Sequence, residues 1–142
     1  NAYFNTFTRL AEYLEETKGY ARLEGCTKTL FGRRRYFPGI TSSAPFIRAQ
    51  AERMAINAPV QGTAADAMRI AMNEVYAYIK KGKRSEHVQM LMQVHDELVF
   101  DVPKEEVDAL KTMVKNEMEN AFDIDVPLVV DIGIGNNWLE AH

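Results

Sequence analysis

Residues 90–102 read Met-Leu-Met-Gln-Val-His-Asp-Glu-Leu-Val-Phe-Asp-Val, and the remainder of the chain is best understood from this stretch. Two apolar runs enclose the charged triplet His95, Asp96 and Glu97. The runs at 91–94 and 98–102 are rich in strand-forming residues and are short for helices, so they predict two strands that meet at a tight turn. The triplet would then lie at the tip of a hairpin.

The adjacent carboxylates of Asp96 and Glu97 require a physical explanation. Two unit charges about 4 Å apart repel each other by about 4 kcal/mol at an effective dielectric constant near 20. A bound divalent cation would remove that cost, which makes the tip a candidate metal site. A solvated turn with ordinary acidic residues is an equally good interpretation of this stretch taken alone.

Length and composition restrict the class of protein. A chain of 142 residues with 46% hydrophobic residues can bury about two thirds of its unfolded surface, so we expect a single domain over 1–142. The single cysteine, Cys26, excludes an internal disulfide and favours a reducing, intracellular setting. No apolar run is long enough to span a membrane, so we expect a soluble protein without a membrane partner. The chain begins with Asn, which fits a piece of something longer.

The net charge of −3 hides a division along the chain. Basic residues dominate from 18 to 53, whereas acidic residues dominate from 96 to 131. Within the basic half, Arg33, Arg34 and Arg35 follow one another, and strand alternation would place Arg33 and Arg35 on one side and Arg34 on the other. These guanidinium groups could grip phosphates. A solvated basic surface is the competing interpretation.

Glycines divide the first part of the chain. Apolar residues at helical spacing from 7 to 14, followed by charged residues up to Lys18, predict a helix that Gly19 closes as its C-cap. Strand-forming residues at 20–23 and 27–37 predict irregular antiparallel strands with turns at the glycines.

Prolines punctuate the middle of the chain. A loop at 38–45 precedes a helix from about residue 46, and Pro59 predicts a bend at which two helices meet. The second helix should run to residue 80 or 81, with an apolar face that begins at Val60 and Ala64 and ends at Ile79. A polar connector at 83–86 then leads into the central hairpin.

The last third predicts one more helix and one more strand. Pro103 suits a first helical position, an apolar stripe follows from Val107 to Ala121, and the helix should end near Phe122. Residues 127–135 alternate apolar with other residues, which predicts a half-buried strand that pairs with the hairpin. The expected fold class is therefore α+β, with an antiparallel sheet of the central hairpin plus this C-terminal strand packed on helices.

Arg53, Asn57 and Gln61 are spaced by four residues, so on a continuous or gently bent helix they would point the same way. One guanidinium and two amides suit phosphates, sugars and minor-groove base edges. Alternatively, Asn57 and Gln61 satisfy backbone groups that Pro59 exposes.

Three motifs occur in one order. They are Thr-Leu-Phe-Gly-Arg-Arg-Arg-Tyr at 29–36, Ala-Glu-Arg-Met-Ala-Ile-Asn-Ala-Pro-Val-Gln-Gly-Thr-Ala-Ala-Asp at 51–66, and Gln-Val-His-Asp-Glu-Leu at 93–98. Together they resemble the C-terminal part of family A DNA polymerases, the bacterial DNA polymerase I type. The resemblance runs from about residue 19 to 139 and includes the stretch at 130–139.

The resemblance implies part of a polymerase palm with adjoining helices, and a DNA-directed DNA polymerase as the complete protein. Asp96 would be a catalytic aspartate that binds Mg²⁺, and Glu97 a supporting carboxylate. Arg53, Asn57, Gln61 and His95 would hold the primer strand and the minor groove, and the arginines at 33–35 would lie near the duplex backbone. Primer-template DNA and deoxynucleoside triphosphates would be the partners, in a bacterial cytosol or nucleoid or in a phage-infected cell.

The chain also departs from a complete family member. The family's other catalytic aspartate and its fingers helix lie upstream of the matched region, and neither is found in 1–142. Residues 1–18 resemble the segment that follows the fingers helix, so we expect the rest of the polymerase chain as a partner that supplies the second ligand set for two Mg²⁺ ions, and an inactive isolated piece. A non-catalytic DNA-binding module that retains the palm fold is the alternative, and a metal-dependent nuclease is a third class. Residues 21–28 are longer than the link expected there, which leaves the strand register and Cys26 open.

Overall fold

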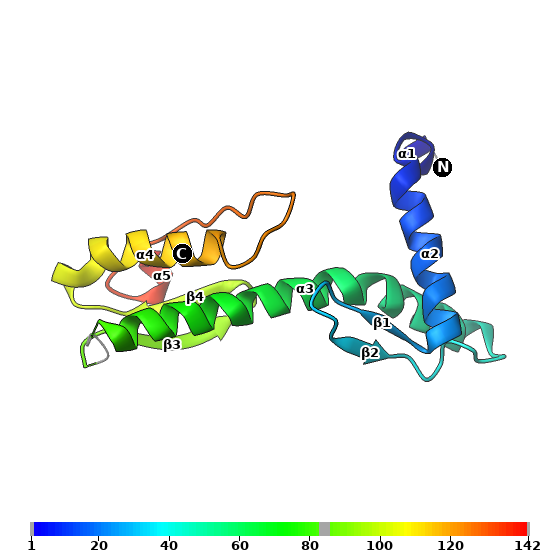
Figure 1. The fold of residues 1–142 in the computed structure, drawn as a ribbon, viewed down its shortest axis with the longest axis horizontal. Helices are drawn as coiled ribbons and strands as arrows, with labels where there is room; N and C mark the ends of the chain where they lie inside the picture. The colour runs from blue at the N-terminus through cyan, green and yellow to red at the C-terminus, as the bar shows by residue number, and fades with distance from the viewer. Residues whose placement is uncertain (1, 83–85, 142) are drawn as a thin grey trace. The chain divides into compact units, whose positions relative to one another are not determined.

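The computed structural model describes residues 2–82 and 86–141. It contains helices and two small antiparallel sheets, so the predicted α+β class is confirmed (Figure 1). The chain divides into two compact units, Asn1–Asp66 and Ala67–His142, and the division falls inside helix α3 (Pro45–Lys81). Within the described ranges, no helix combines the length and the apolar character that a membrane crossing requires.

The first unit begins with helices α1 (Ala2–Thr6) and α2 (Thr8–Glu24). The predicted helix end at Gly19 and the predicted strand at 20–23 are wrong, because α2 continues through both. Burial of Thr17 and Ala21 outweighs the roughly 1 kcal/mol that a glycine costs inside a helix. Gly25 closes the helix instead, with a φ of 70° and its N–H donating to the Ala21 carbonyl at 2.9 Å.

A short hairpin follows, made of β1 (Cys26–Lys28) and β2 (Arg34–Tyr36). The strands are antiparallel, with Lys28 opposite Arg34, and Gly32 turns the chain between them with a φ of 82°. The predicted antiparallel strands are therefore confirmed for this part of 27–37. The hairpin and α2 pack on the first part of α3 around a small core of Ala21, Phe37, Ile40, Ala51, Ala55 and Ala58.

Helix α3 is continuous across Pro59, so the predicted pair of helices is wrong. Proline removes one backbone donor, but buried alanines at 55 and 58 keep this part of α3 on the core. The Thr63 hydroxyl also donates to the Pro59 carbonyl at 2.7 Å, which ties the next turn to the proline. The helix ends at Lys81 as predicted. Val60 and Ala64 are exposed, contrary to the predicted apolar face, whereas Ile79 is buried.

The second unit contains the central hairpin, β3 (Gln89–Val94) and β4 (Glu97–Asp101). The predicted hairpin is confirmed, with His95 and Asp96 in the turn and Glu97 already in β4 opposite Val94. The hairpin is followed in the chain by a 3₁₀ turn, η1 (Lys104–Glu106), and by helix α4 (Val107–Glu119). Residues 83–85 of the predicted polar connector lie outside the described residues.

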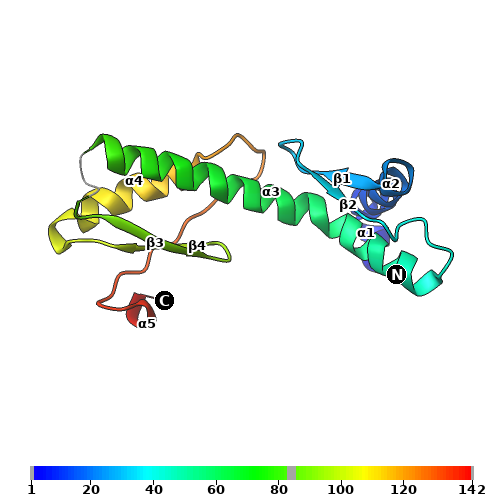
Figure 2. The same cartoon turned by 90° about the horizontal axis from the view of Figure 1, so that it is seen from below.

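The hairpin and α4 pack on the last part of α3 (Figure 2). Their shared core is aliphatic and consists of Val75, Ile79, Val88, Leu110, Met113 and Val114. Helix α4 ends at Glu119 rather than near Phe122, and Pro103 precedes the 3₁₀ turn instead of opening a long helix.

The predicted strand at 127–135 is wrong, because this segment forms neither strand nor helix. Its backbone bonds elsewhere: the Val130 N–H donates to the Glu119 carboxylate at 3.0 Å. The segment then packs closely against the C-terminal helical turn α5 (Trp138–Ala141). A Cβ on Gly135 would lie 2.8 Å from the Ala141 nitrogen, so only glycine fits there. Among the described residues, the sheet of the second unit therefore consists of the β3–β4 hairpin.

Candidate functional site

Helix α3 presents the predicted row of Arg53, Asn57 and Gln61, and all three side chains are exposed. None of them makes a hydrogen bond or ion pair with another residue of the described chain. The alternative that Asn57 and Gln61 satisfy the backbone around Pro59 is wrong, because neither side chain hydrogen-bonds any group of the described chain. The amides and the guanidinium of this row are therefore available to a ligand.

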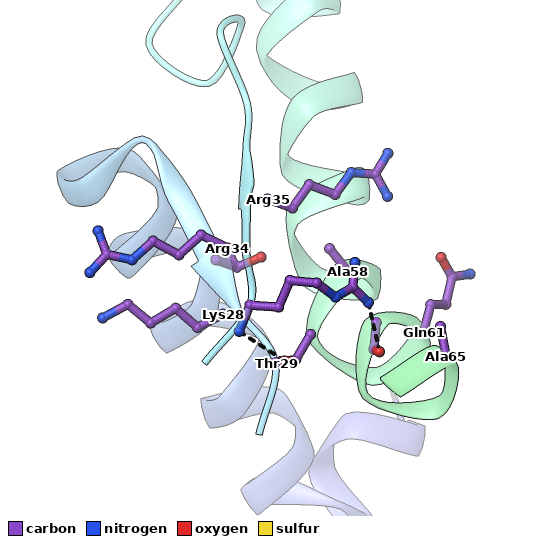
Figure 3. Close-up of a pocket in the computed structure, with 10 residues that line it drawn as sticks. Lys28, Thr29, Arg34, Arg35, Ala58, Gln61 and Ala65 are labelled. Atoms are coloured by element: carbon purple, nitrogen blue, oxygen red, sulfur yellow. Dashed lines mark hydrogen bonds between the residues drawn. The ribbon is translucent and has the colours of Figure 1, made fainter. Parts of the chain in front are cut away.

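The arginines of the β1–β2 hairpin alternate as predicted. Arg34 and Lys28 extend to one side of the hairpin, whereas Arg35 extends to the other side, across α3 (Figure 3). A hollow of about 190 Å³ is lined by residues of this hairpin and by Gln61 of α3. The first unit thus presents cations on both sides of one hairpin, with an amide donor nearby on α3, which suits an anionic ligand.

Arg33 differs from its two neighbours because its side chain is hydrogen-bonded to helix α3. Its Nε donates to an Asp66 carboxylate oxygen at 2.7 Å, and its Nη2 donates to the Gly62 carbonyl at 2.9 Å. The Leu30 N–H donates to the Thr63 hydroxyl oxygen at 3.1 Å. Together these bonds fix the tip of the β1–β2 hairpin to α3.

Sequence reasoning assigned no role to Thr63 or Asp66, although both lie in the motif at 51–66. One local signal was present for Thr63. A threonine four residues after Pro59 can donate to the proline carbonyl within the helix. Asp66 carried no comparable signal, because its partner Arg33 is 33 residues away in the sequence.

Charge and aromatic contacts shape the outer side of the hairpin. Lys28 and Arg34 are register partners, and like charges opposite one another on a sheet destabilise it. Tyr36, which hydrogen-bonds the Arg34 guanidinium, raises the pKa of Arg34 above its usual value. The Lys28 ammonium lies 5.7 Å from the centre of the Tyr20 ring. A phosphate near this side would relieve the repulsion between the two cations.

The tip of the β3–β4 hairpin presents the acidic residues of the second unit. Asp96 is exposed in the turn, and Glu97 is half-buried at the start of β4. His95 has a φ of 52°, in the left-handed region that residues other than glycine seldom adopt. The side-chain amide of Gln93 donates to the His95 carbonyl, which holds this conformation in place. The turn therefore projects His95 and Asp96 together into solvent.

The donor chemistry of this tip suits Mg²⁺, which prefers carboxylate oxygens. However, the described residues supply too few ligands for a metal ion. Within residues 2–82 and 86–141, no group of three or more His, Cys, Asp or Glu side chains gathers closely enough to hold a metal ion. A metal bound by Asp96 and Glu97 would need further oxygen ligands from outside the described residues.

The motifs and this site chemistry agree with a comparison against protein families. A model of DNA polymerase family A matches residues 1–140. The chain belongs to DNA polymerase family A. The resemblance seen in the three sequence motifs is thereby confirmed.

Individual relatives support this assignment of the family A chain. It is 47% identical over 139 residues to the thermostable DNA polymerase I of Thermus filiformis, covering 98% of this chain and 16% of the relative. It is 45% identical over 140 residues to DNA polymerase I of Caldicellulosiruptor bescii, covering 99% and 16%. The chain thus spans about one sixth of the length of the relatives it matches.

A solved structure with the same fold is similar to the family A chain. It is described as the POL domain of Pol1 from M. smegmatis in complex with DNA primer-template and dNTP. The two chains superpose with a TM-score of 0.90 at 43% sequence identity, over 98% of this chain and 24% of the other. The α+β arrangement of the family A chain is therefore that of part of a polymerase domain.

Proposed function

We propose that this chain is the C-terminal palm part of a DNA-directed DNA polymerase, with residues 1–18 following the fingers helix and residues 1–142 acting as one domain. The complete protein adds deoxynucleotides from their triphosphates to the 3′-hydroxyl of a primer paired with a template, in the bacterial cytoplasm. One observation carries the proposal: the family A match over 1–140 includes an exposed Asp96 beside Glu97 at the tip of a hairpin.

In this proposal Asp96 is a direct ligand of Mg²⁺, and Glu97 supports it from the first position of β4. Two bound Mg²⁺ ions would lower the pKa of the primer 3′-hydroxyl and stabilise the leaving pyrophosphate. An aspartate elsewhere in the complete protein supplies the remaining ligand set. The short donor count in the described residues is consistent with this division of ligands.

The remaining predicted residues form the proposed DNA-binding surface. Arg53, Asn57 and Gln61 donate to the primer strand and to the minor groove beside the growing end, together with His95. The minor groove presents similar acceptors for every base pair, so donors placed there test pair geometry without reading the sequence. A copying enzyme needs that property. Arg34 and Arg35 bind backbone phosphates, and Arg33 belongs to the same hairpin.

The experiment is primer extension by the complete protein with Asp96→Ala. We expect nucleotide addition to fall by roughly a thousandfold, since a metal ligand of the reacting groups is lost. The dissociation constant for primer-template DNA should change by less than about twofold. Asp101→Ala, at the exposed end of the same hairpin, is the matched control and should retain extension.

Retained extension by Asp96→Ala would contradict the assignment of the catalytic residue. A wild-type protein that binds DNA and extends no primer would instead support the second candidate, a non-catalytic DNA-binding module. The observation that favours this second candidate is the incomplete set of metal ligands among the described residues.

A further inference from the structure

The three consecutive arginines of the β1–β2 hairpin have different surroundings. Arg34 extends away from α3 beside Lys28, and Arg35 extends across α3. Arg33 instead places two of its nitrogens on α3, at Asp66 and at the Gly62 carbonyl. A residue that binds its own protein through two directed bonds is not free to follow a phosphate.

The charge of Arg33 is also compensated. The Asp66 side chain is 14% exposed, and its carboxylate accepts from Arg33 at 2.7 Å. A paired guanidinium adds little to the attraction of a polyanion, because the neighbouring carboxylate repels the same phosphates. Arg34 and Arg35 have no ion pair with a carboxylate in the described chain and keep their full charge.

The contact between hairpin and helix is close enough to depend on glycine. A Cβ at position 62 would lie 2.6 Å from the Thr29 methyl group and 3.5 Å from Arg33 Nη2. Thr29 cannot rotate freely, because its hydroxyl oxygen accepts from the Arg33 N–H at 3.2 Å. Any side chain at position 62 would push the hairpin away from α3.

We propose that Arg33 is a positioning residue that clamps the β1–β2 hairpin to α3. The clamp holds Arg34 and Arg35 at fixed positions relative to Gln61 for DNA binding. We define the clamp as Arg33, Gly62, Thr63 and Asp66. This proposal rests on the proposed DNA-binding function and changes the role of one residue within it. Arg33 acts through its neighbours and touches no phosphate.

The first test compares Arg33→Lys with Arg34→Lys in the complete protein. Both variants keep the positive charge, but lysine cannot reach a carboxylate and a carbonyl with two nitrogens fixed in one plane. The clamp predicts that Arg33→Lys weakens primer-template binding by about tenfold, whereas Arg34→Lys stays within about threefold. The salt dependence of binding should keep its wild-type slope in both variants, since no charge is lost.

The second test is Asp66→Asn, for which the two roles of Arg33 predict opposite signs. Removal of a carboxylate near a polyanion should tighten binding if Arg33 is a phosphate ligand, because the guanidinium is then unpaired. The clamp predicts weaker binding, by about fivefold, because the hairpin loses its anchor. Gly62→Ala changes no charge and should weaken binding in the same way.

The rate of nucleotide addition at saturating DNA distinguishes loss of the clamp from a general loss of folding. Clamp variants should keep that rate within about twofold of wild type, because Asp96 is untouched, while misfolding would lower the active fraction. Wild-type affinity of Arg33→Lys together with tighter binding by Asp66→Asn would overturn the clamp and leave the polymerase assignment standing. Absence of DNA binding by the wild-type protein would instead overturn the proposed function.

Discussion

The two hairpins of this chain are supported in different ways. The β1–β2 hairpin rests on a core in which four of the six buried residues are alanines, and its tip is held by hydrogen bonds to α3. The β3–β4 hairpin rests on a core of larger aliphatic side chains from α3 and α4. The first presents cations and the second presents carboxylates.

This difference follows from what each hairpin is proposed to do. Cations that grip a polyanion must be held at fixed spacing, and directed polar bonds set spacing well. A carboxylate that binds a metal must be held on a rigid part of the backbone, and close aliphatic packing makes the hairpin rigid. The stability of the two hairpins should therefore respond to different changes.

Removal of aliphatic volume should loosen the β3–β4 hairpin most. Val75 is fully buried, so Val75→Ala should cost about 2 kcal/mol through lost burial and a cavity. Hydrogen exchange of the complete protein should then speed up about thirtyfold in β3 and β4. Val129→Ala, at a side chain that is 75% exposed, is the control and should change nothing. Equal acceleration in both hairpins would contradict their separate support.

Loss of an exposed cation should affect DNA binding rather than stability. Arg53→Ala should weaken primer-template binding by about fivefold and reduce the slope of its salt dependence by about 0.9, if Arg53 contacts one phosphate. A series of binding titrations between low and moderate salt measures both quantities. Arg9→Ala, an exposed arginine of α2 paired with Glu12, is the control. An unchanged slope would assign Arg53 to a base edge or to structure.

The ion pair between α2 and α3 should contribute little. Arg22 donates to the Glu52 carboxylate at 2.6 and 3.1 Å, with the arginine side chain 48% exposed. A double-mutant cycle with Arg22→Ala and Glu52→Ala should give a coupling of about 0.5 kcal/mol that shrinks as salt is added. A coupling energy that is insensitive to salt would mean that side-chain packing, rather than electrostatic attraction, stabilises the pair.

The smallest effect concerns pH and the polar turn at the C-terminus. Glu140 accepts hydrogen bonds from the Asn136 N–H and from the side chains of Asn136 and Asn137, which lower the pKa of its carboxyl group. Because the folded pKa is depressed, the carboxylate stabilises this turn above the unfolded pKa, about 4.3, and the contribution is lost as the pH falls through the folded pKa. A carbon-13 titration of the carboxyl group should show the lowered value, and Asn137→Ala should return it toward normal. A normal wild-type pKa would contradict the contacts.

Local patterns were sufficient where neighbours in the sequence are also neighbours in space. Short runs of strand-forming residues at 91–94 and 98–102 predicted the β3–β4 hairpin, and consecutive arginines predicted their alternate sides. The motif resemblance supplied the family, which the match over residues 1–140 confirmed.

Predictions failed where distant partners decide the outcome. Gly19 resembled a helix end, but burial of Ala21 against another helix carried α2 to Glu24. Residues 127–135 alternate like a strand, yet Glu119 takes the Val130 N–H and no ladder forms. Arg33 has the same sequence surroundings as Arg34 and Arg35, and its bond to Asp66, 33 residues away, gives it a different environment.

The most direct test is single-turnover nucleotide addition by the complete protein over a range of primer-template concentrations, compared for Asp96→Asn and Arg35→Ala. The account predicts that Asp96→Asn lowers the maximal rate by roughly a thousandfold with nearly unchanged DNA affinity, while Arg35→Ala weakens affinity several-fold with the maximal rate nearly unchanged. A maximal rate retained by Asp96→Asn, or equal effects of both substitutions on both quantities, would contradict the account. In that account the β3–β4 hairpin carries catalysis and the β1–β2 hairpin carries DNA binding.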